Sequence, residues 1–301
     1  MDRVLIVGGS GMVGAQLQKK LIERGYSVSI LGRSKSKVDI NCFFKWNIET
    51  KTIDEEAITS ADYIINLAGA GIAAKRWTNA RKKEIISSRV DSTKFLVETI
   101  KKTNSKPKAF ISASAIGYYG AITSDKIFNE NDSQSEDFLG TCCQAWEDAS
   151  KEIVELNVRR TIIRIGIVLS NNGGALTKML PPFKFGFGSA IATGKQYMPW
   201  IHIDDLCEVF IKAIEDSKME GIYNATSPNP PTNNGFSIAL AKVLKKPYFL
   251  PNIPSFLIKT ALGERAVIAL KGNKVSAEKI KAKGFKHEYL KLEDALINLL
   301  K

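Results

Sequence analysis

The strongest constraint on the fold stands at the start of the chain, where a short apolar run leads into three evenly spaced glycines. Residues 4–7 are apolar and predict a buried strand, and Gly8, Gly11 and Gly14 follow it. Apolar residues at helical spacing come next, and residues 26–31 form a second apolar run. Strand, glycine turn, helix and strand offer a pyrophosphate the amides and positive dipole end of a helix N-terminus. The sequence therefore predicts a dinucleotide-binding α/β fold.

The glycine spacing narrows this prediction. It reads Gly-x-x-Gly-x-x-Gly and not the Gly-x-Gly-x-x-Gly of typical dehydrogenases. That spacing resembles the short-chain dehydrogenase/reductase superfamily, particularly its extended, epimerase-like branch. The alternative reading is a plain strand-to-helix turn without a ligand.

Arg33 indicates which dinucleotide is bound. NAD-binding units usually place an acid near the end of the second strand to bond the ribose 2′-hydroxyl. Here Arg33 follows that strand, and no Asp or Glu occurs between Tyr26 and Val38. An arginine pairs with a 2′-phosphate through charge-assisted bonds, so we expect NADP(H). The alternative is an ordinary surface arginine at a strand end.

Composition excludes several classes of protein. The chain has 301 residues, 44% of them hydrophobic and 25% charged, which is ordinary globular composition. No apolar run reaches the length of a membrane span, and the first apolar run is too short for a signal-peptide core. Four cysteines without a Cys-x-x-Cys pair, and only two histidines, argue against a metal site. We expect a reduced, cytoplasmic protein.

The net charge of +12 comes mainly from two stretches. Residues 75–108 hold 11 basic and 3 acidic residues (+8), and residues 259–291 hold 9 basic and 3 acidic residues (+6). Lysine-rich solvated helix faces are the favoured interpretation, and attraction of anionic nucleotides comes second. Nucleic acid ranks last, because neither stretch has interleaved aromatic residues or a recognisable nucleic-acid module.

Further elements complete a doubly wound parallel sheet. We expect strands at 43–46, 62–67, 109–112, 161–165, 200–203 and 221–225, and a long helix at 79–103. We also expect a helix after the strand at 200–203, with Asp204 as its N-cap. We assign residues 1–168, with return elements at about 199–225, to a nucleotide-binding domain. Residues 169–198 and 226–301 form a smaller, mainly helical substrate domain. Residues 171–197 look like a lid over the substrate or, nearly as well, like an oligomer contact.

The usual catalytic pair of the superfamily is missing. A Tyr followed four residues later by Lys normally provides a phenolate base near neutral pH. None of the eight tyrosines has a lysine at that distance. Leu139 and Cys143 stand where the Tyr and the Lys are expected. Among the remaining polar groups, Ser114 fits the serine at the end of the fifth strand, although tight packing also explains a serine there.

The motifs together resemble an atypical subgroup of the superfamily over nearly the whole chain. They include Asn66-Leu67-Ala68-Gly69, Ser88-Arg89, Trp146-Glu147, residues 164–169, residues 200–205 and Leu262-Gly263-Glu264. Its members are labelled epimerase/dehydratase, nucleotide-sugar epimerase-like or, in some bacteria, cell-division inhibitor, and carry a C-terminal domain of unknown function. The subgroup similarly has Cys in place of the Lys, and Arg in place of an Asn at the position of Arg89.

This resemblance implies a site. It implies NADP(H), with Gly32 and Arg33 at the 2′-phosphate and Val168 near the nicotinamide. The remaining cofactor positions that it implies are Gly8, Gly11, Met12, Val13, Gly14, Leu67, Ala68, Gly69, Glu84 and Arg89. By analogy with extended members, a homodimer would form through the helices at 79–103 and 138–155.

Two functions remain open from the sequence, with nucleic-acid binding a distant third. The first is an NADP(H)-dependent oxidoreductase or epimerase-like enzyme acting on a small polar or nucleotide-linked substrate. Ser114 would hold the reacting oxygen, Tyr118 or Tyr119 would act as the acid, and Cys143 or His202 would assist. For His202 the favoured alternative is a packed structural histidine. A tyrosine near its reference pKa of about 10 is a poor base but a workable acid, which favours reduction. The second is a non-catalytic NADP(H)-binding regulator.

Overall fold

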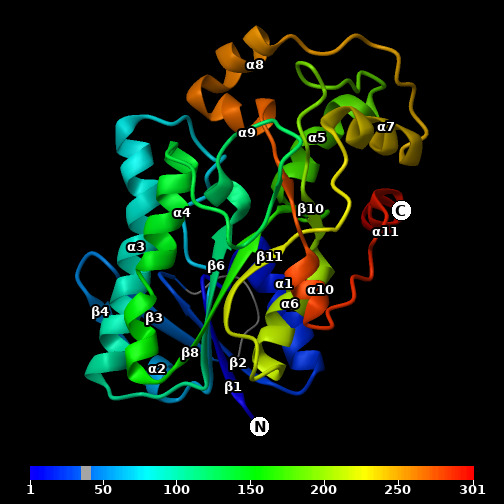
Figure 1. Cartoon of the computed structure of the whole chain (residues 1–301). Coiled ribbons are helices and arrows are strands. Elements are labelled where there is room, and N and C mark those ends of the chain that lie inside the picture. The colour runs from blue at the N-terminus through cyan, green and yellow to red at the C-terminus, as the bar shows by residue number, and fades with distance from the viewer. Residues whose placement is uncertain (35–41) are drawn as a thin grey trace.

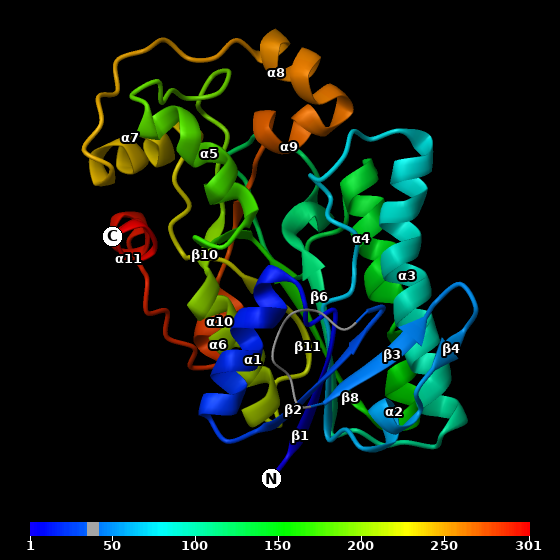
Figure 2. The same ribbon diagram turned by 180° about the vertical axis from the view of Figure 1, so that it is seen from behind.

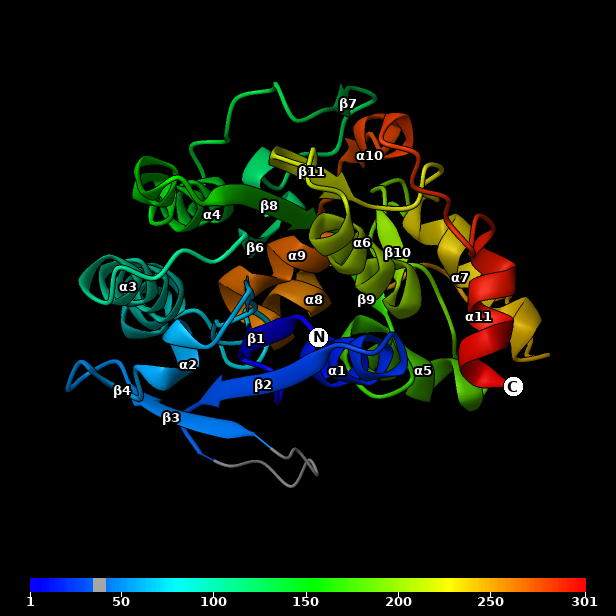
Figure 3. The same ribbon diagram turned by 90° about the horizontal axis from the view of Figure 1, so that it is seen from below.

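The computed structural model describes residues 1–34 and 42–301, which are built around one eight-stranded sheet. The strand order is β11-β8-β6-β5-β1-β2-β3-β4, and every pair is parallel except β3 with β4. Figure 3 shows the sheet from below. The strands are β1 (Arg3–Val7), β2 (Ser27–Gly32), β3 (Phe43–Asn47), β4 (Thr52–Ile53), β5 (Tyr63–Asn66), β6 (Ala109–Ala115), β8 (Arg159–Ile165) and β11 (Gly221–Ala225).

Helices cover both faces of the sheet, because parallel strands need crossover connections (Figure 1). One face carries α1 (Met12–Glu23) and α6 (Ile203–Glu215), and the other carries α2 (Glu56–Thr59), α3 (Asn79–Lys102) and α4 (Phe138–Asp148). The strand residues at 4–7 are completely buried, as their uninterrupted apolar run predicts. The predicted α/β class and doubly wound parallel sheet are confirmed.

A smaller, mainly helical part lies above the carboxyl ends of the strands (Figures 1 and 2). Its helices are α5 (Gly174–Lys184), α7 (Asn233–Val243), α8 (Ser255–Leu262), η3 (Gly263–Ala266), α9 (Val267–Leu270) and α11 (Leu292–Leu300). Helix α10 (Glu278–Ala282) packs beside the edge strand β11. Two short parallel pairs, β9 (Ile167–Leu169) with β10 (Trp200–His202) and β7 (Ile127–Phe128) with β12 (Lys274–Val275), help to join it to the sheet. The 3-10 helices η1 (Ile116–Tyr119) and η2 (Lys151–Leu156) complete the chain.

One apolar core continues from the sheet into this helical part. It includes Leu17 of α1, Phe210 of α6, Phe236 of α7 and Leu296 of α11, all fully buried. Because this core includes residues on both sides of residue 168, the packing does not separate two domains there. The division into nucleotide-binding and substrate-binding parts stays a prediction about function.

Three local predictions differ from the structure. Strand β6 extends to Ala115, so Ser114 lies inside the strand and not after it. Asp204 does not cap α6: His202 is the N-cap, and its Nδ1 accepts the Asp204 amide at 3.1 Å. The Asp204 side chain instead accepts a hydrogen bond from Gln16 at 2.6 Å. The antiparallel β4 was not predicted. No helix in the described part of the chain is long and apolar enough to span a membrane.

Candidate functional site

The glycine turn between β1 and α1 is held by backbone hydrogen bonds and by its close approach to a neighbouring loop. Gly8 has a φ of +79°, which favours glycine, and its amide donates to Leu31 O at 3.2 Å. The Gly11 amide donates to Gly8 O at 3.2 Å. A Cβ on Gly8 would lie 3.1 Å from the backbone of Leu67 and Ala68. The turn therefore packs directly on the loop that follows β5.

Gly14 and Gln18 fix the first turn of α1 against the glycine turn. A Cβ on Gly14 would lie 2.6 Å from the Cα and carbonyl oxygen of Gly9. The buried Gln18 donates through Nε2 to Gly9 O at 2.6 Å and to Gly14 O at 3.1 Å. Sequence reasoning missed Gln18, whose only signal was a polar residue one position from the apolar face of a predicted helix.

The loop after β5 is positioned by two polar side chains. The buried Asn66 accepts the Ala68 amide at 3.1 Å and donates to Thr93 Oγ1 at 2.9 Å. Ser88 Oγ accepts the Ala70 amide at 3.0 Å. These bonds hold the loop of Leu67, Ala68 and Gly69, and Gly8 of the glycine turn packs against it.

Arg89 lies directly behind this loop. A Cβ on Gly69 would be 3.1 Å from Arg89 Cζ. The guanidinium donates to Ile85 O at 2.8 Å and lies 5.0 Å from the centre of the Trp146 ring. Burial lowers the pKa of Arg89, and no carboxylate within residues 1–34 and 42–301 forms an ion pair with it. A partly buried cation without a protein counter-ion is suited to an anionic ligand.

Arg33 and Glu84 share one edge of the site. Arg33 is exposed at the carboxyl end of β2, and residues 35–38 of the acid-free run lie outside the described residues. Glu84 pairs with Arg81 at 2.7 Å. That hydrogen bond is the main cause of the lowered pKa of Glu84, and attraction by Lys75 and Arg33 adds to it. Arg33 follows β2 and Glu84 lies in α3, so two separate elements bring charged groups to this part of the protein.

Met12 and Val168 lie close together beside Gly174. The Met12 sulfur is 3.4 Å from the Cβ position of Gly174, which is also 3.4 Å from Val168 O. Met12, Val13 and Val168 are partly buried against the main apolar core. At the end of β2, a Cβ on Gly32 would lie 3.1 Å from the Phe43 ring, which is a tight contact. The structure thus places Leu67 and Ala68 against the glycine turn, and Arg89 against Gly69 of the same loop.

The catalytic candidates surround a buried ion pair that sequence reasoning did not identify. Glu147 of α4 accepts two hydrogen bonds from Arg164 of β8, each at 2.8 Å. Both side chains are at least 96% buried. Ser114 Oγ donates to Glu147 Oε1 at 2.7 Å. Burial opposes the charge of Arg164, but the bonds to Glu147 outweigh it, so the pKa of Arg164 is raised. The motifs contained both residues, yet nothing in their spacing predicted that they pair.

The two adjacent tyrosines have different environments. The Tyr119 hydroxyl donates to Asn224 Oδ1 at 2.8 Å and accepts from Arg164 Nη1 at 3.0 Å. Burial raises the pKa of Tyr119 to about 12. Tyr118 lies under the Arg164 guanidinium, 3.3 Å from ring centre to Cζ. Its hydroxyl has no hydrogen-bond partner among residues 1–34 and 42–301.

Cys143 and His202 are packed inside the protein. Cys143 is buried beside Gly117, and burial raises the pKa of its thiol to about 12, so it is neutral near pH 7. It cannot supply the positive charge that a lysine would bring to this position. His202 is fully buried, stacks on Tyr289 at 3.8 Å and contacts Asn298 at 3.2 Å. Burial lowers the pKa of His202, and its contacts are those of a structural residue.

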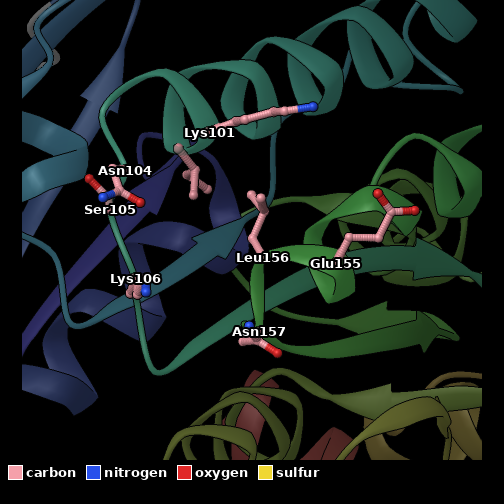
Figure 4. Close-up of a pocket in the computed structure, with 8 residues that line it drawn as sticks. Lys101, Asn104, Ser105, Lys106, Glu155, Leu156 and Asn157 are labelled. Carbon is pink, nitrogen blue, oxygen red and sulfur yellow. The ribbon is translucent and has the colours of Figure 1, made fainter.

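One surface hollow lies away from these residues. It is found between the last turn of α3 and the end of η2, near the amino ends of β6 and β8 (Figure 4). Lys101, Asn104, Glu155 and Asn157 are among its lining residues. It contains none of the predicted site residues, which all gather near the carboxyl ends of the strands, where open α/β sheets bind ligands.

The parallel sheet and the glycine turn define a dinucleotide-binding protein of the Rossmann type, and comparison with known proteins gives the family. The NAD dependent epimerase/dehydratase family matches residues 4–226, and a domain of unknown function, DUF1731, matches residues 253–299. The chain belongs to this epimerase/dehydratase family, as the sequence motifs predicted.

The similarity to individual relatives extends over whole chains. The Bacillus subtilis epimerase family protein YfhF is 35% identical over 300 residues, covering 99% of this chain and 97% of the relative. Mouse epimerase family protein SDR39U1 is 33% identical and covers 98% of both chains. The crystal structure of human SDR39U1 (isoform 2) with NADPH matches with a TM-score of 0.90 and 30% identity. The match covers 99% of this chain and 98% of that chain.

Proposed function

We propose that this chain binds NADP(H) at the glycine turn. The amino end of α1 and the close approach allowed by Gly11 suit the pyrophosphate. Arg33 suits the 2′-phosphate, and Arg89, which forms no ion pair within residues 1–34 and 42–301, provides a second cation. The human relative of 30% identity was crystallised with NADPH, which supports the same choice here. When bound, the cofactor supplies or accepts a hydride.

We further propose an oxidoreductase or epimerase-like reaction on a small polar or nucleotide-linked substrate, with Tyr118 as the proton donor. The observation that carries this assignment is that Tyr118 has the one candidate hydroxyl left without a protein partner in the described part of the chain. Ser114 donates its hydroxyl hydrogen bond to Glu147, so it can only accept a hydrogen bond from a substrate.

Cofactor choice is tested by titrating the protein with NADPH and NADH while following cofactor fluorescence. We expect the protein to bind NADPH more tightly than NADH. Arg33→Ala should lower the affinity for NADPH by about 10- to 100-fold, because it removes a charge-assisted hydrogen bond. Arg3→Ala is the matched control, because Arg3 is exposed at the other end of β1. Equal affinity for both cofactors, or no change in Arg33→Ala, would contradict the assignment.

Tyr118 is tested once a substrate is found by hydride-transfer screening. Tyr118→Phe should lower kcat by about 100-fold or more, the usual contribution of a general acid, with NADPH affinity unchanged. Tyr119→Phe is the comparison, because its hydroxyl is bound to Asn224 and Arg164 and should matter mainly for stability. Unchanged turnover in Tyr118→Phe would exclude the proposed role.

A second candidate function is a non-catalytic NADP(H)-dependent regulator. The observation favouring it is the neutral, buried Cys143 where a catalytic lysine would stand. A ligand that binds one conformer more tightly shifts the population toward it. NADPH should then change the pattern of limited proteolysis in the wild type but not in Arg33→Ala, without any substrate being turned over.

Three further assignments complete the proposal. A homodimer would form through α3 and α4, which lie side by side on one face of the sheet (Figure 3). The cysteines Cys42, Cys142, Cys143 and Cys207 are all free thiols, which suits a reducing compartment such as the cytoplasm. Nucleic acid stays the lowest-ranked partner.

A further inference from the structure

The helical part of the protein contains two long stretches without a carboxylate. No Asp or Glu occurs between Glu155 and Asp204, or between Glu220 and Glu264. We call residues 171–198 and 226–263 the basic cap. Its seven lysines are all exposed. They are Lys178, Lys184, Lys195, Lys242, Lys245, Lys246 and Lys259. The charge of the basic cap is therefore +7, with no acidic side chain of its own.

Most of this charge is not neutralised by neighbouring parts of the protein. Lys242 pairs with Glu293 at 3.0 Å, and Lys178 donates to Ala73 O. The other five have no carboxylate in ion-pair contact within residues 1–34 and 42–301. Lysines elsewhere on the surface commonly do have such partners, for example Lys82 with Glu264.

The same region exposes four phenylalanines, which we call the phenylalanine patch. Phe185 is 77% exposed, Phe187 67%, Phe249 74% and Phe256 63%. The first two follow α5, and the others lie before and within α8. Helix α8 has no buried residue, and its Leu257 is also 48% exposed. So many large apolar side chains in one region of a surface mark an interaction site.

Two segments that carry Phe185, Phe187 and Phe249 lie against each other. A Cβ on Gly186 would lie 3.6 Å from the Pro247 ring. The Ala192 amide donates to Ile253 O, and the Ile253 amide donates to Ala190 O, both at 2.8 Å. Residues 185–192 and 247–253 therefore run side by side, beyond the carboxyl ends of the strands (Figures 1 and 2). Lysines stand next to the patch in the sequence at Lys184 and at Lys245-Lys246.

We propose that the phenylalanine patch and the unpaired lysines of the basic cap bind an anionic phospholipid surface. Phenylalanines enter the boundary between headgroups and acyl chains, while lysines contact anionic headgroups. A second copy of the chain fits poorly, because it would place seven lysines against seven lysines. Nucleic acid also fits less well, because Leu257 can enter an acyl boundary but cannot stack on a base.

The test is co-sedimentation of the full chain with vesicles. Vesicles of phosphatidylcholine alone are compared with phosphatidylcholine mixed with phosphatidylglycerol, at low and high salt. We expect binding to the anionic vesicles, weakened by salt. Lys245→Gln with Lys246→Gln should lower the partition coefficient by about thirtyfold, given the attraction of each lysine near an anionic surface. Phe185→Ser with Phe187→Ser should lower it by at least about tenfold.

Matched controls remove the same groups elsewhere. Lys94→Gln with Lys101→Gln removes two exposed lysines of α3, and Ile22→Ser removes an apolar side chain 59% exposed on α1. Both should sediment like the wild type, and thermal unfolding checks that every variant is folded. Absence of vesicle binding, equal binding to neutral vesicles, or equal loss in the controls would overturn the proposal. Self-association or DNA binding that is lost in the cap variants, without vesicle binding, would also overturn it. NADPH titration of the same samples tests the cofactor site separately.

Discussion

Replacing Glu147 by alanine should lower the free energy of unfolding by about 3–5 kcal/mol, because the change leaves a buried guanidinium without its counter-ion. Arg164 is 1% exposed and gives two hydrogen bonds of 2.8 Å to Glu147. The same substitution removes the acceptor of the Ser114 hydroxyl. Urea unfolding followed by circular dichroism measures the loss.

Two comparisons separate the ion pair from general effects on α4 and its surroundings. Glu152→Ala removes an exposed carboxylate of η2 and should change the free energy of unfolding by less than about 0.5 kcal/mol. Glu147→Gln keeps the size and one acceptor oxygen and should be less destabilising than Glu147→Ala. If Glu147→Ala unfolds like the wild type, the pair does not contribute to stability as the burial argues.

Replacing Gly14 by alanine should lower both stability and NADPH binding, whereas replacing Gly11 should lower NADPH binding alone. The Gly14 methyl would lie 2.6 Å from the Gly9 backbone, so α1 must shift, at a cost of about 1–3 kcal/mol in stability. We expect NADPH binding to be lost as well, since the shift moves the helix N-terminus that holds the pyrophosphate. Urea unfolding and NADPH titration are measured on the same preparation.

Gly11→Ala supplies the contrast. Gly11 has an ordinary φ of −75°, and its Cβ would lie 3.5 Å from Gly8 O, which is normal contact. Stability should therefore be nearly unchanged. The methyl would stand at the N-cap of α1, where the cofactor must approach closely, so NADPH affinity should fall by about 10- to 100-fold. Full NADPH affinity in Gly11→Ala would show that the pyrophosphate does not approach this turn.

Local sequence patterns predicted the fold well, because each pattern carries its own physical cause. The apolar run at 4–7 can only be a buried strand beside glycines, and the periodic residues of 79–103 produced α3 within one residue of the expected end. The cofactor candidates were also found from local signals, since a glycine turn and a charged residue at a strand end are visible in the sequence.

The catalytic neighbourhood was less accessible from the sequence, because its contacts join residues far apart in the chain. Ser114 looked like a free hydroxyl at a strand end, but Glu147, 33 residues away, accepts its hydrogen bond. From the sequence, His202 could be a proton shuttle or a packed structural residue. Its stacking on Tyr289 in the structure favours the packed role. Asp204 looked like a helix cap until the His202 ring was seen to take that place.

The sequence by itself determined the α/β class, the glycine turn, the family and the absence of the Tyr-x-x-x-Lys pair, because these depend on residue type and short-range spacing. Only the tertiary structure decided which hydroxyl remains free at the site, that Glu147 neutralises Arg164, and that two acid-free stretches meet in one basic cap. Those outcomes depend on which side chains the sheet and its crossovers bring within hydrogen-bond distance, and residue spacing along the chain does not encode that distance.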